Sequence, residues 1–370
     1  MQVTVQQQQQ EIAAHPRDSL LWVRLARTYA ELQQPAKAME AAQRAEKMSG
    51  KTPEVQHALA LFYAQLGNRK RAAELELDYA RSNPGKDTFA AARAAFLCAE
   101  SGLLKEAVEM GEIAVNRQDR GDIRALLAKT YESFGKPEKA LEQYRGWLKL
   151  EPYNEQAYSE FGGSLLRLGR FTEAVPMLED ARSKFDKSPQ ILLALGVAYY
   201  GQRRFEDAAI YFLKVIDLSP DVEQPYVFLA KMLDQLGPQL PDVLARFAAW
   251  NDLEKRNPLP PFVYAKALLA AGQSKDQAEA LLRESIHRDD KLWEAHFELA
   301  TLLEQKQDWN GSRLELERAV ALSPQQAAAY YRLARVYDRL ELPAKAAEAR
   351  KKHASLVAGE KLKNGMAVNE

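Results

Sequence analysis

A small residue, alanine or glycine, recurs at intervals of 33 to 35 residues along most of this chain of 370 residues. The ten positions are Ala26, Ala60, Ala95, Ala128, Gly162, Gly196, Ala230, Ala265, Ala300 and Ala334. A fixed period of this length predicts an array of similar units, each packed mainly against its neighbours. The period therefore overrides the two or three globular domains that the length alone would suggest.

Residues 189–222 show what one period contains. Apolar residues fall at helical spacing on both sides of a turn at residues 201–204. Gly196 lies before this turn, and a second small residue, Ala208, follows it. Eight of the ten periods carry a second small residue in the same place: Ala38, Ala72, Ala107, Ala140, Ala174, Ala208, Ser312 and Ala346. The pattern predicts a hairpin of two helices that approach each other closely at the small pair.

Glycine and proline mark where the helices should end. Six glycines stand where the first helix of a hairpin must stop, which is typical of a left-handed C-terminal cap: Gly67, Gly102, Gly135, Gly169, Gly237 and Gly272. Four prolines follow the second helix, because proline cannot continue a helix: Pro84, Pro152, Pro220 and Pro324. Both signals support the period set by the small residues.

This pattern resembles the tetratricopeptide repeat, and the resemblance covers about residues 19–358. It implies an all-α fold, a right-handed superhelical solenoid of antiparallel helix hairpins. In that family the first helix of each hairpin lines a concave groove that binds peptides or partner proteins. The residues by themselves predict the same fold class, a helical array with a one-dimensional core.

Departures from the period divide the chain into five expected parts. These are a truncated or capping helix at 1–18, repeats one to six with the first helix of repeat seven at 19–236, a proline-rich bend with the second helix of repeat seven at 237–261, repeats eight to ten at 262–358, and a disordered tail at 359–370. The first segment is either a polar cap or the end of a longer array. The prolines within 237–261 either bend the array or only lengthen a loop, since loops tolerate insertions at little cost.

Repeat three, residues 88–120, carries smaller residues than its neighbours at inward positions. Ala94, Cys98 and Gly111 stand where other repeats place leucine, tyrosine or larger residues. Because less apolar area is buried, at roughly 25 cal/mol per Å², we expect this to be the least stable internal repeat.

Charge and cysteine content limit the classes of function. The chain has 51 basic and 51 acidic residues, so no overall field attracts nucleic acid or a membrane surface. A single cysteine excludes an intramolecular disulfide and any multi-cysteine metal site. The first residues lack the features of a secretory leader, and no stretch approaches the length of a membrane helix. We expect a cytoplasmic protein that binds no nucleic acid and does not insert into a membrane, unless the chain is truncated at its start.

No constellation of residues indicates catalysis. The five histidines are far apart in the sequence, and none pairs with another at the spacing that brings two ligands to one helix face: His15, His57, His287, His296 and His353. Cys98 lies on a predicted inward face, where a lone cysteine usually behaves as a small apolar residue. We therefore predict no enzyme activity, no metal and no cofactor.

The remaining candidate is the groove. By the family's geometry, eleven residues of the first helices point into it: Phe89, Phe96, Val197, Tyr200, Val227, Lys231, Phe262, Lys266, Phe297, Tyr331 and Arg335. Aromatic anchors between cations suit a peptide with apolar and some acidic side chains. About half of these aromatic residues could instead pack between adjacent repeats.

We accordingly expect a non-enzymatic scaffold or adaptor that binds a peptide or partner protein, chiefly through repeats six to ten. The alternative is a substrate-recognition or targeting arm of a larger enzyme, with the catalytic part upstream or on another subunit. The sequence indicates neither the partner nor the oligomeric state, because repeat folds host many unrelated functions.

Overall fold

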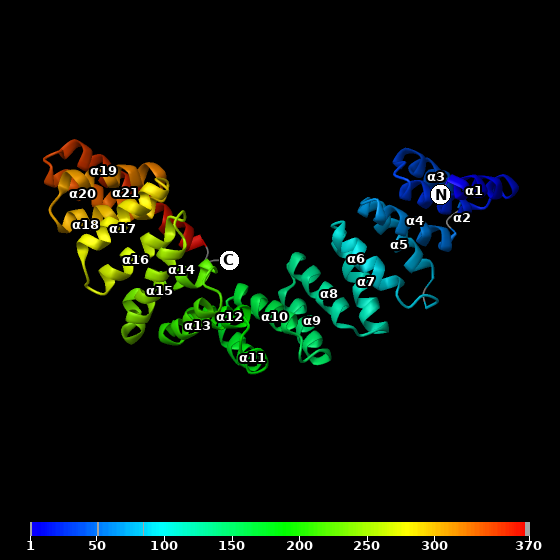
Figure 1. The fold of residues 1–370 in the computed structure, drawn as a ribbon, viewed down its shortest axis with the longest axis horizontal. Helices are drawn as coiled ribbons and strands as arrows, with labels where there is room; N and C mark the ends of the chain where they lie inside the picture. The colour runs from blue at the N-terminus through cyan, green and yellow to red at the C-terminus, as the bar shows by residue number, and fades with distance from the viewer. Residues whose placement is uncertain (1, 50–51, 84, 367–370) are drawn as a thin grey trace. The chain divides into compact units, whose positions relative to one another are not determined.

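The computed structural model describes residues 2–49, 52–83 and 85–366. Within these ranges the chain forms α-helices and two short 3₁₀ helices, with no β-strand. Successive helices are paired along the chain (Figure 1). The predicted all-α fold of helix hairpins is confirmed. The helices form two compact units, unit 1 at residues 1–173 and unit 2 at residues 174–370.

Unit 1 starts with a single helix, which is followed by hairpins in chain order. Its helices are α1 (Gln2–Ala14), α2 (Ser19–Glu31), α3 (Pro35–Met48), α4 (Pro53–Gln65), α5 (Arg69–Ser82), α6 (Ala90–Glu100), α7 (Leu104–Arg117), α8 (Gly121–Ser133), α9 (Pro137–Leu150) and α10 (Glu155–Arg167). The boundary between the units falls within α11 (Phe171–Lys184).

Unit 2 continues the same alternation of first and second helices. After α11 come α12 (Pro189–Gly201), α13 (Phe205–Leu218), α14 (Glu223–Lys231), the 3₁₀ helices η1 (Leu233–Gln235) and η2 (Gly237–Gln239), α15 (Leu240–Leu253), α16 (Leu259–Ala270), α17 (Lys275–Arg288), α18 (Trp293–Gln305), α19 (Trp309–Leu322), α20 (Ala327–Arg339) and α21 (Pro343–Met366).

The turn inside each hairpin is left-handed, whichever residue occupies it. The predicted turn glycines have positive φ, for example Gly67 at 77°. The same turn occurs without glycine at four equivalent positions: Gln33, Arg203, Gln307 and Glu341. For a residue other than glycine, the left-handed backbone conformation costs roughly 1–2 kcal/mol. Packing of the two helices therefore imposes the turn, and glycine only lowers its cost.

Tyrosines join consecutive repeats. Each lies three residues after the small residue of a first helix, and its hydroxyl donates to a glutamate on the preceding second helix. Tyr63 bonds Glu46 at 3.1 Å, and Tyr337 bonds Glu317 at 2.8 Å. The remaining pairs are Tyr131 with Glu112 and Tyr199 with Glu179. Burial, together with the charge and hydrogen bond of Glu46, raises the pKa of Tyr63 to about 12, which keeps the phenol protonated and donating.

The proline-rich segment at residues 237–261 lies within unit 2. After α14 the backbone passes through η1 and η2, which take up the extra residues, and then enters α15. Pro241 lies in the first turn of α15, where a missing amide proton costs little. The boundary between the compact units lies in α11, upstream of residues 237–261. Whether these prolines bend the array or only lengthen a loop stays open. Pro84, expected to close a second helix, lies outside the described residues.

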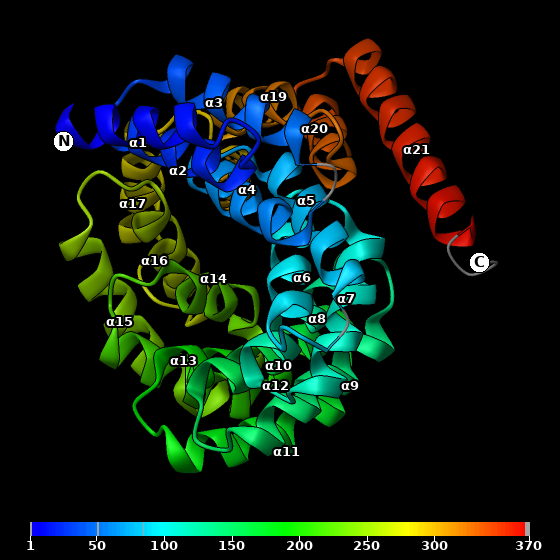
Figure 2. The same cartoon turned by 90° about the vertical axis from the view of Figure 1, so that its right-hand side faces the viewer.

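The C-terminal segment is more helical than expected. α21 runs to Met366 without a break (Figure 2), so the tail expected at 359–370 is helical as far as that residue. Alanine, leucine, glutamate and lysine predominate after residue 353, and all four favour helix. Residues 367–370 lie outside the described ranges.

Two glycines on first helices provide a matched test of the small-residue contact. A Cβ added to Gly196 would lie 2.5 Å from Cε1 of Phe212, whereas one added to Gly163 meets only the flexible end of Arg167 at 3.3 Å. We expect Gly196→Ala to lower the free energy of unfolding by about 1–3 kcal/mol. Gly163→Ala should leave it unchanged or raise it by up to about 1 kcal/mol. Denaturant unfolding followed by circular dichroism measures both, and equal effects would contradict the predicted packing.

Candidate functional site

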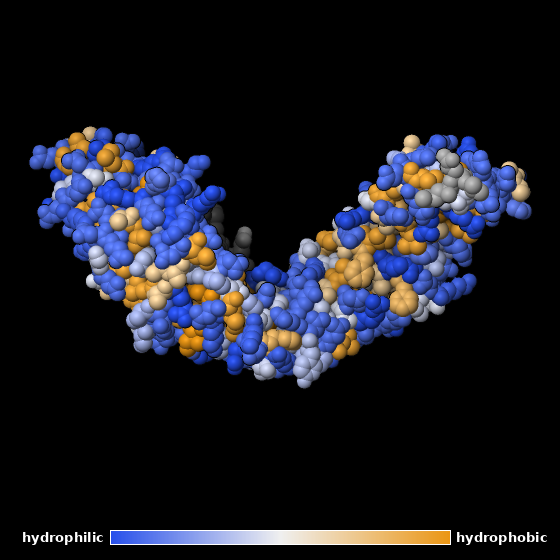
Figure 3. Space-filling view, viewed as in Figure 1, coloured by the Kyte–Doolittle hydropathy of each residue, from blue (hydrophilic) through white to orange (hydrophobic). Residues whose placement is uncertain are grey.

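The predicted groove residues of unit 1 are exposed. Phe89 immediately precedes α6 and is 46% exposed. Phe96 lies on α6 seven residues later, which is about two helical turns, and it is also exposed. Two leucines that we did not predict are exposed at the same offsets from their small residues: Leu20 on α2 and Leu61 on α4. These four side chains form what we call the apolar face of unit 1. Figure 3 shows hydrophobic side chains gathered over the part of unit 1 that contains α4, α5 and α6.

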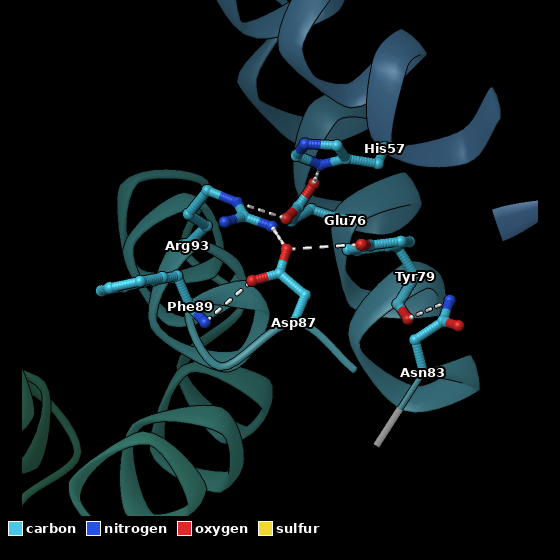
Figure 4. A network of polar contacts seen from close by, with 7 residues as sticks. All are labelled: His57, Glu76, Tyr79, Asn83, Asp87, Phe89 and Arg93. Atoms are coloured by element: carbon cyan, nitrogen blue, oxygen red, sulfur yellow. Dashed lines mark hydrogen bonds and ion pairs between the residues drawn. The ribbon is translucent and has the colours of Figure 1, made fainter. Parts of the chain in front are cut away.

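A buried carboxylate lies beside this face (Figure 4). Glu76 on α5 has no solvent exposure and lies between two partners. His57 on α4 contacts it through Nδ1 at 2.7 Å, and Arg93 on α6 donates to it through Nε at 2.8 Å. The His57 ring also stacks on Tyr79 with 4.8 Å between centroids. One side chain of α5 thus connects the first helices of repeats two and three.

Asp87 extends the network to Phe89. Arg93 donates to one oxygen of Asp87 through Nη2, and Tyr79 donates to the same oxygen at 3.3 Å. The other oxygen accepts the backbone N–H of Phe89 at 2.9 Å. The bond from Arg93 holds the pKa of Asp87 below its ordinary value. Burial alone would disfavour the charge on Arg93, but Asp87 and Glu76 more than offset this and raise its pKa.

The network has a structural consequence for the apolar face. Breaking a buried charge pair is costly because one charge is left without compensation. His57, Glu76 and Arg93 therefore hold α4, α5 and α6 in one arrangement, and Asp87 fixes the backbone from which Phe89 projects. The side chains of this face are thus held in order before any ligand binds, and such order reduces the entropy that a binding surface loses.

In unit 2 the predicted groove residues divide into exposed and packed sets. Tyr331 is 51% exposed, and Lys231 and Arg335 are also exposed. Phe262 is only 9% exposed and belongs to the core. The others are half-buried: Val197, Tyr200, Val227, Lys266 and Phe297. Tyr200, for example, packs edge-on against Phe205 and Phe228.

Each of four consecutive first helices of unit 2 carries an aromatic ring that lies near a cation, and for Phe297 on α18 the cation comes from the next first helix, α20. The cation lies 5.5 to 5.9 Å from the ring centroid, within the range of cation–π attraction. The pairs are Lys231 with Phe228, Lys266 with Phe262, Arg332 with Phe297, and Arg335 with Tyr331. Two of the cations also meet carboxylates: Lys266 lies 3.8 Å from Glu298, and Arg332 lies 3.3 Å from Glu304.

The side chains of Cys98 and His296, which could in principle take part in catalysis, are buried or hydrogen-bonded within the fold. Cys98 is buried, and burial raises the pKa of its thiol to about 11. Both ring nitrogens of His296 have partners, Glu315 at 2.6 Å and the carbonyl oxygen of Asp290 at 3.0 Å. In the described part of the chain no three His, Cys, Asp or Glu side chains come close enough together to bind a metal ion. None of the helices described here combines the length and the hydropathy of a membrane span.

Family models for the tetratricopeptide repeat match residues 20–52, 160–223, 264–326 and 298–355. The chain is a tetratricopeptide repeat protein. Its helix hairpins and the recurring small residues are the features on which the sequence resemblance rested.

Several solved structures match this chain at low sequence identity. A structure of Naa15/Naa10 bound to HypK-THB is 14% identical with a TM-score of 0.51, covering 93% of this chain and 64% of that chain. Yeast Tom70 is 16% identical with a TM-score of 0.45, covering 95% and 88%. YrrB, described as a TPR protein with an unusual peptide-binding site, is 20% identical with a TM-score of 0.42, covering 50% and 95%. None of the curated proteins compared with the chain matches it.

Asp87→Asn tests the network at this face. The pKa of Asp87 is lowered in the folded state, so its stabilising contribution is present above its ordinary value of 3.8 and is lost as the pH falls through the folded value. We expect the variant to lose about 1–2 kcal/mol of unfolding free energy near neutral pH. The difference from the parent should shrink in strong acid.

The measurement is denaturant unfolding at a series of pH values. Asp78→Asn is the matched control, because Asp78 lies exposed on α5 and should change stability little. A loss that is the same at neutral and acid pH would contradict the role assigned to the Asp87 charge.

Proposed function

We propose that this tetratricopeptide repeat protein is a binding scaffold whose apolar face in unit 1 docks an apolar segment of a partner protein. Proteins of this family generally mediate protein–protein interactions. The observation that carries the proposal is the exposure of large apolar side chains at two recurring positions of repeats one to three. Leu20 and Phe89 occupy one of these positions, and Leu61 and Phe96 occupy the other. Exposed apolar side chains that gather on one part of a surface mark interaction sites, and Figure 3 shows such a gathering over the part of unit 1 that contains α4, α5 and α6.

The arrangement of the face suits a contact that contributes to affinity. Aromatic side chains supply much of the energy at interfaces when a partner excludes water from them. Arg120 lies 5.7 Å from the ring centroid of Phe89, which places a polar edge beside the apolar centre. An apolar centre with a polar edge is the usual composition of a protein interface.

The exposed ring and cation of unit 2 extend the proposal to acidic side chains. Tyr331 and Arg335 on α20 face solvent together, and Lys231 on α14 is exposed above Phe228. A cation held on a ring keeps a defined direction, and it can meet a carboxylate of the partner. We propose these residues as secondary contacts, and Phe262 as a core residue that supports them.

The experiment compares two double variants in affinity capture with mass spectrometry from a lysate of the source organism. Phe89→Ala with Phe96→Ala removes the aromatic part of the face. Leu253→Ala with Leu314→Ala removes two leucines that are also exposed but lie on the second helices α15 and α19. We expect the first pair to weaken binding of the captured partner by about tenfold or more, while the second pair binds like the parent.

Circular dichroism should show both variants folded, because all four side chains are exposed. Partner binding that survives loss of both phenylalanines, or that falls equally in the leucine control, would refute the assignment of the face.

A further inference from the structure

A second kind of surface recurs on the other helices of the array. Between two successive second helices, above the first helix that separates them, lies an open notch. The structure has such notches between α1 and α3, between α7 and α9, and between α19 and α21, with volumes of about 490, 300 and 680 Å³. Because the notches are built alike, the differences in their side chains can be compared directly.

In the smaller notch between α7 and α9, both cations have carboxylate partners. Arg124 reaches across it to Asp119 and to Oε1 of Gln143 at 3.0 Å. Lys139 lies 3.6 Å from Glu112 and over the ring of Tyr131. An acidic ligand would therefore have to compete with carboxylates that already pair with Arg124 and Lys139.

In the notch between α1 and α3, the two cations lie over aromatic rings. Arg44 lies 5.0 Å from the ring of Trp22, and Lys37 lies 5.7 Å from that of Tyr29. These contacts occupy the aromatic surface of the notch, so a ligand would first have to displace the cations.

The notch between α19 and α21 differs from both. Tyr330, Leu333 and Tyr337 of α20 line it, with Val320 of α19 and Ala349 of α21. Three lysines of α21 stand around it: Lys345, Lys351 and Lys352. Lys345 lies over Tyr337 at 5.5 Å and 3.9 Å from Glu317.

Two of these lysines have no partner. Among the described residues, Lys351 and Lys352 contact neither a carboxylate nor a ring. The notch also contains two carboxylates. Glu317 accepts from Tyr337 at 2.8 Å and from Arg313 at 3.0 Å, so it is already engaged. Glu348 also lines the notch, which leaves two unpartnered lysines facing one further carboxylate.

We propose that this notch is a binding site for an acidic peptide segment that carries an aromatic or branched aliphatic side chain. The apolar side chain would pack against Tyr330 and Leu333, and neighbouring carboxylates would meet Lys351 and Lys352. Charge complementarity selects an acidic ligand, and a volume of 680 Å³ is in the range of sites that hold small ligands or a few side chains. The site lies between second helices, so it is separate from the first-helix face of the proposed function.

The test uses fluorescence anisotropy with a short synthetic peptide in which glutamate alternates with phenylalanine. A second peptide replaces phenylalanine with serine at the same charge. We expect the full chain to bind the first peptide more tightly than the second. Lys351→Glu with Lys352→Glu should weaken binding of the first peptide by about tenfold, and Tyr330→Ala should weaken it while leaving the charge intact.

The matched control is Lys70→Glu with Lys105→Glu, which changes the net charge equally at exposed positions on α5 and α7. Binding like that of the parent supports the notch, and an equal loss in both charge variants would overturn it in favour of general charge attraction. Absence of binding to the parent, or equal binding of the two peptides, would also overturn it. Vesicles of phosphatidylglycerol provide the last arm: binding to them, without binding to the peptide, would replace the peptide assignment with a membrane.

Discussion

The close approach of two helices at a pair of small residues is the contact on which the remaining structure depends. A hairpin joined in this way has apolar surface left on both sides, and it can bury that surface only against another hairpin. The period of 33 to 35 residues follows from this requirement. So do the left-handed turns, which form even where the chain offers glutamine, arginine or glutamate. At four places a tyrosine–glutamate bond also joins a repeat to the one before.

Repeats two and three depart from this regularity at the place where function is proposed. Their small residues keep the period, because Ala60 and Ala95 lie 35 residues apart, but a buried carboxylate takes part in the contact between these repeats. Charged groups in a core contribute less to stability than apolar packing of the same volume, but they define a single arrangement when every partner is present. Glu76 therefore holds α4 and α6 in one orientation. The exposed Phe89 and Phe96, at the start of α6 and on it, keep fixed positions as a result.

Much of the fold could be predicted from the sequence, because the hairpin contact is local and periodic. The small residues, the turn glycines and the register of residues 189–222 correspond to the helices observed. The exposure of single side chains could not be predicted. Phe89 and Phe262 both belong to the predicted groove, yet one is exposed and the other is packed, because exposure depends on the neighbouring repeat. The network was also missed, although Glu76 lies between two leucines of a second helix, which was a signal of a buried charge.

Hydrogen exchange of the full chain, with and without the partner captured through the apolar face, tests the central claim most directly. The account predicts slower exchange in α2, α4 and α6 when the partner is bound, with the largest change at the start of α6, where Asp87 holds the amide of Phe89. Slower exchange confined to second helices, with these three first helices unchanged, would contradict it.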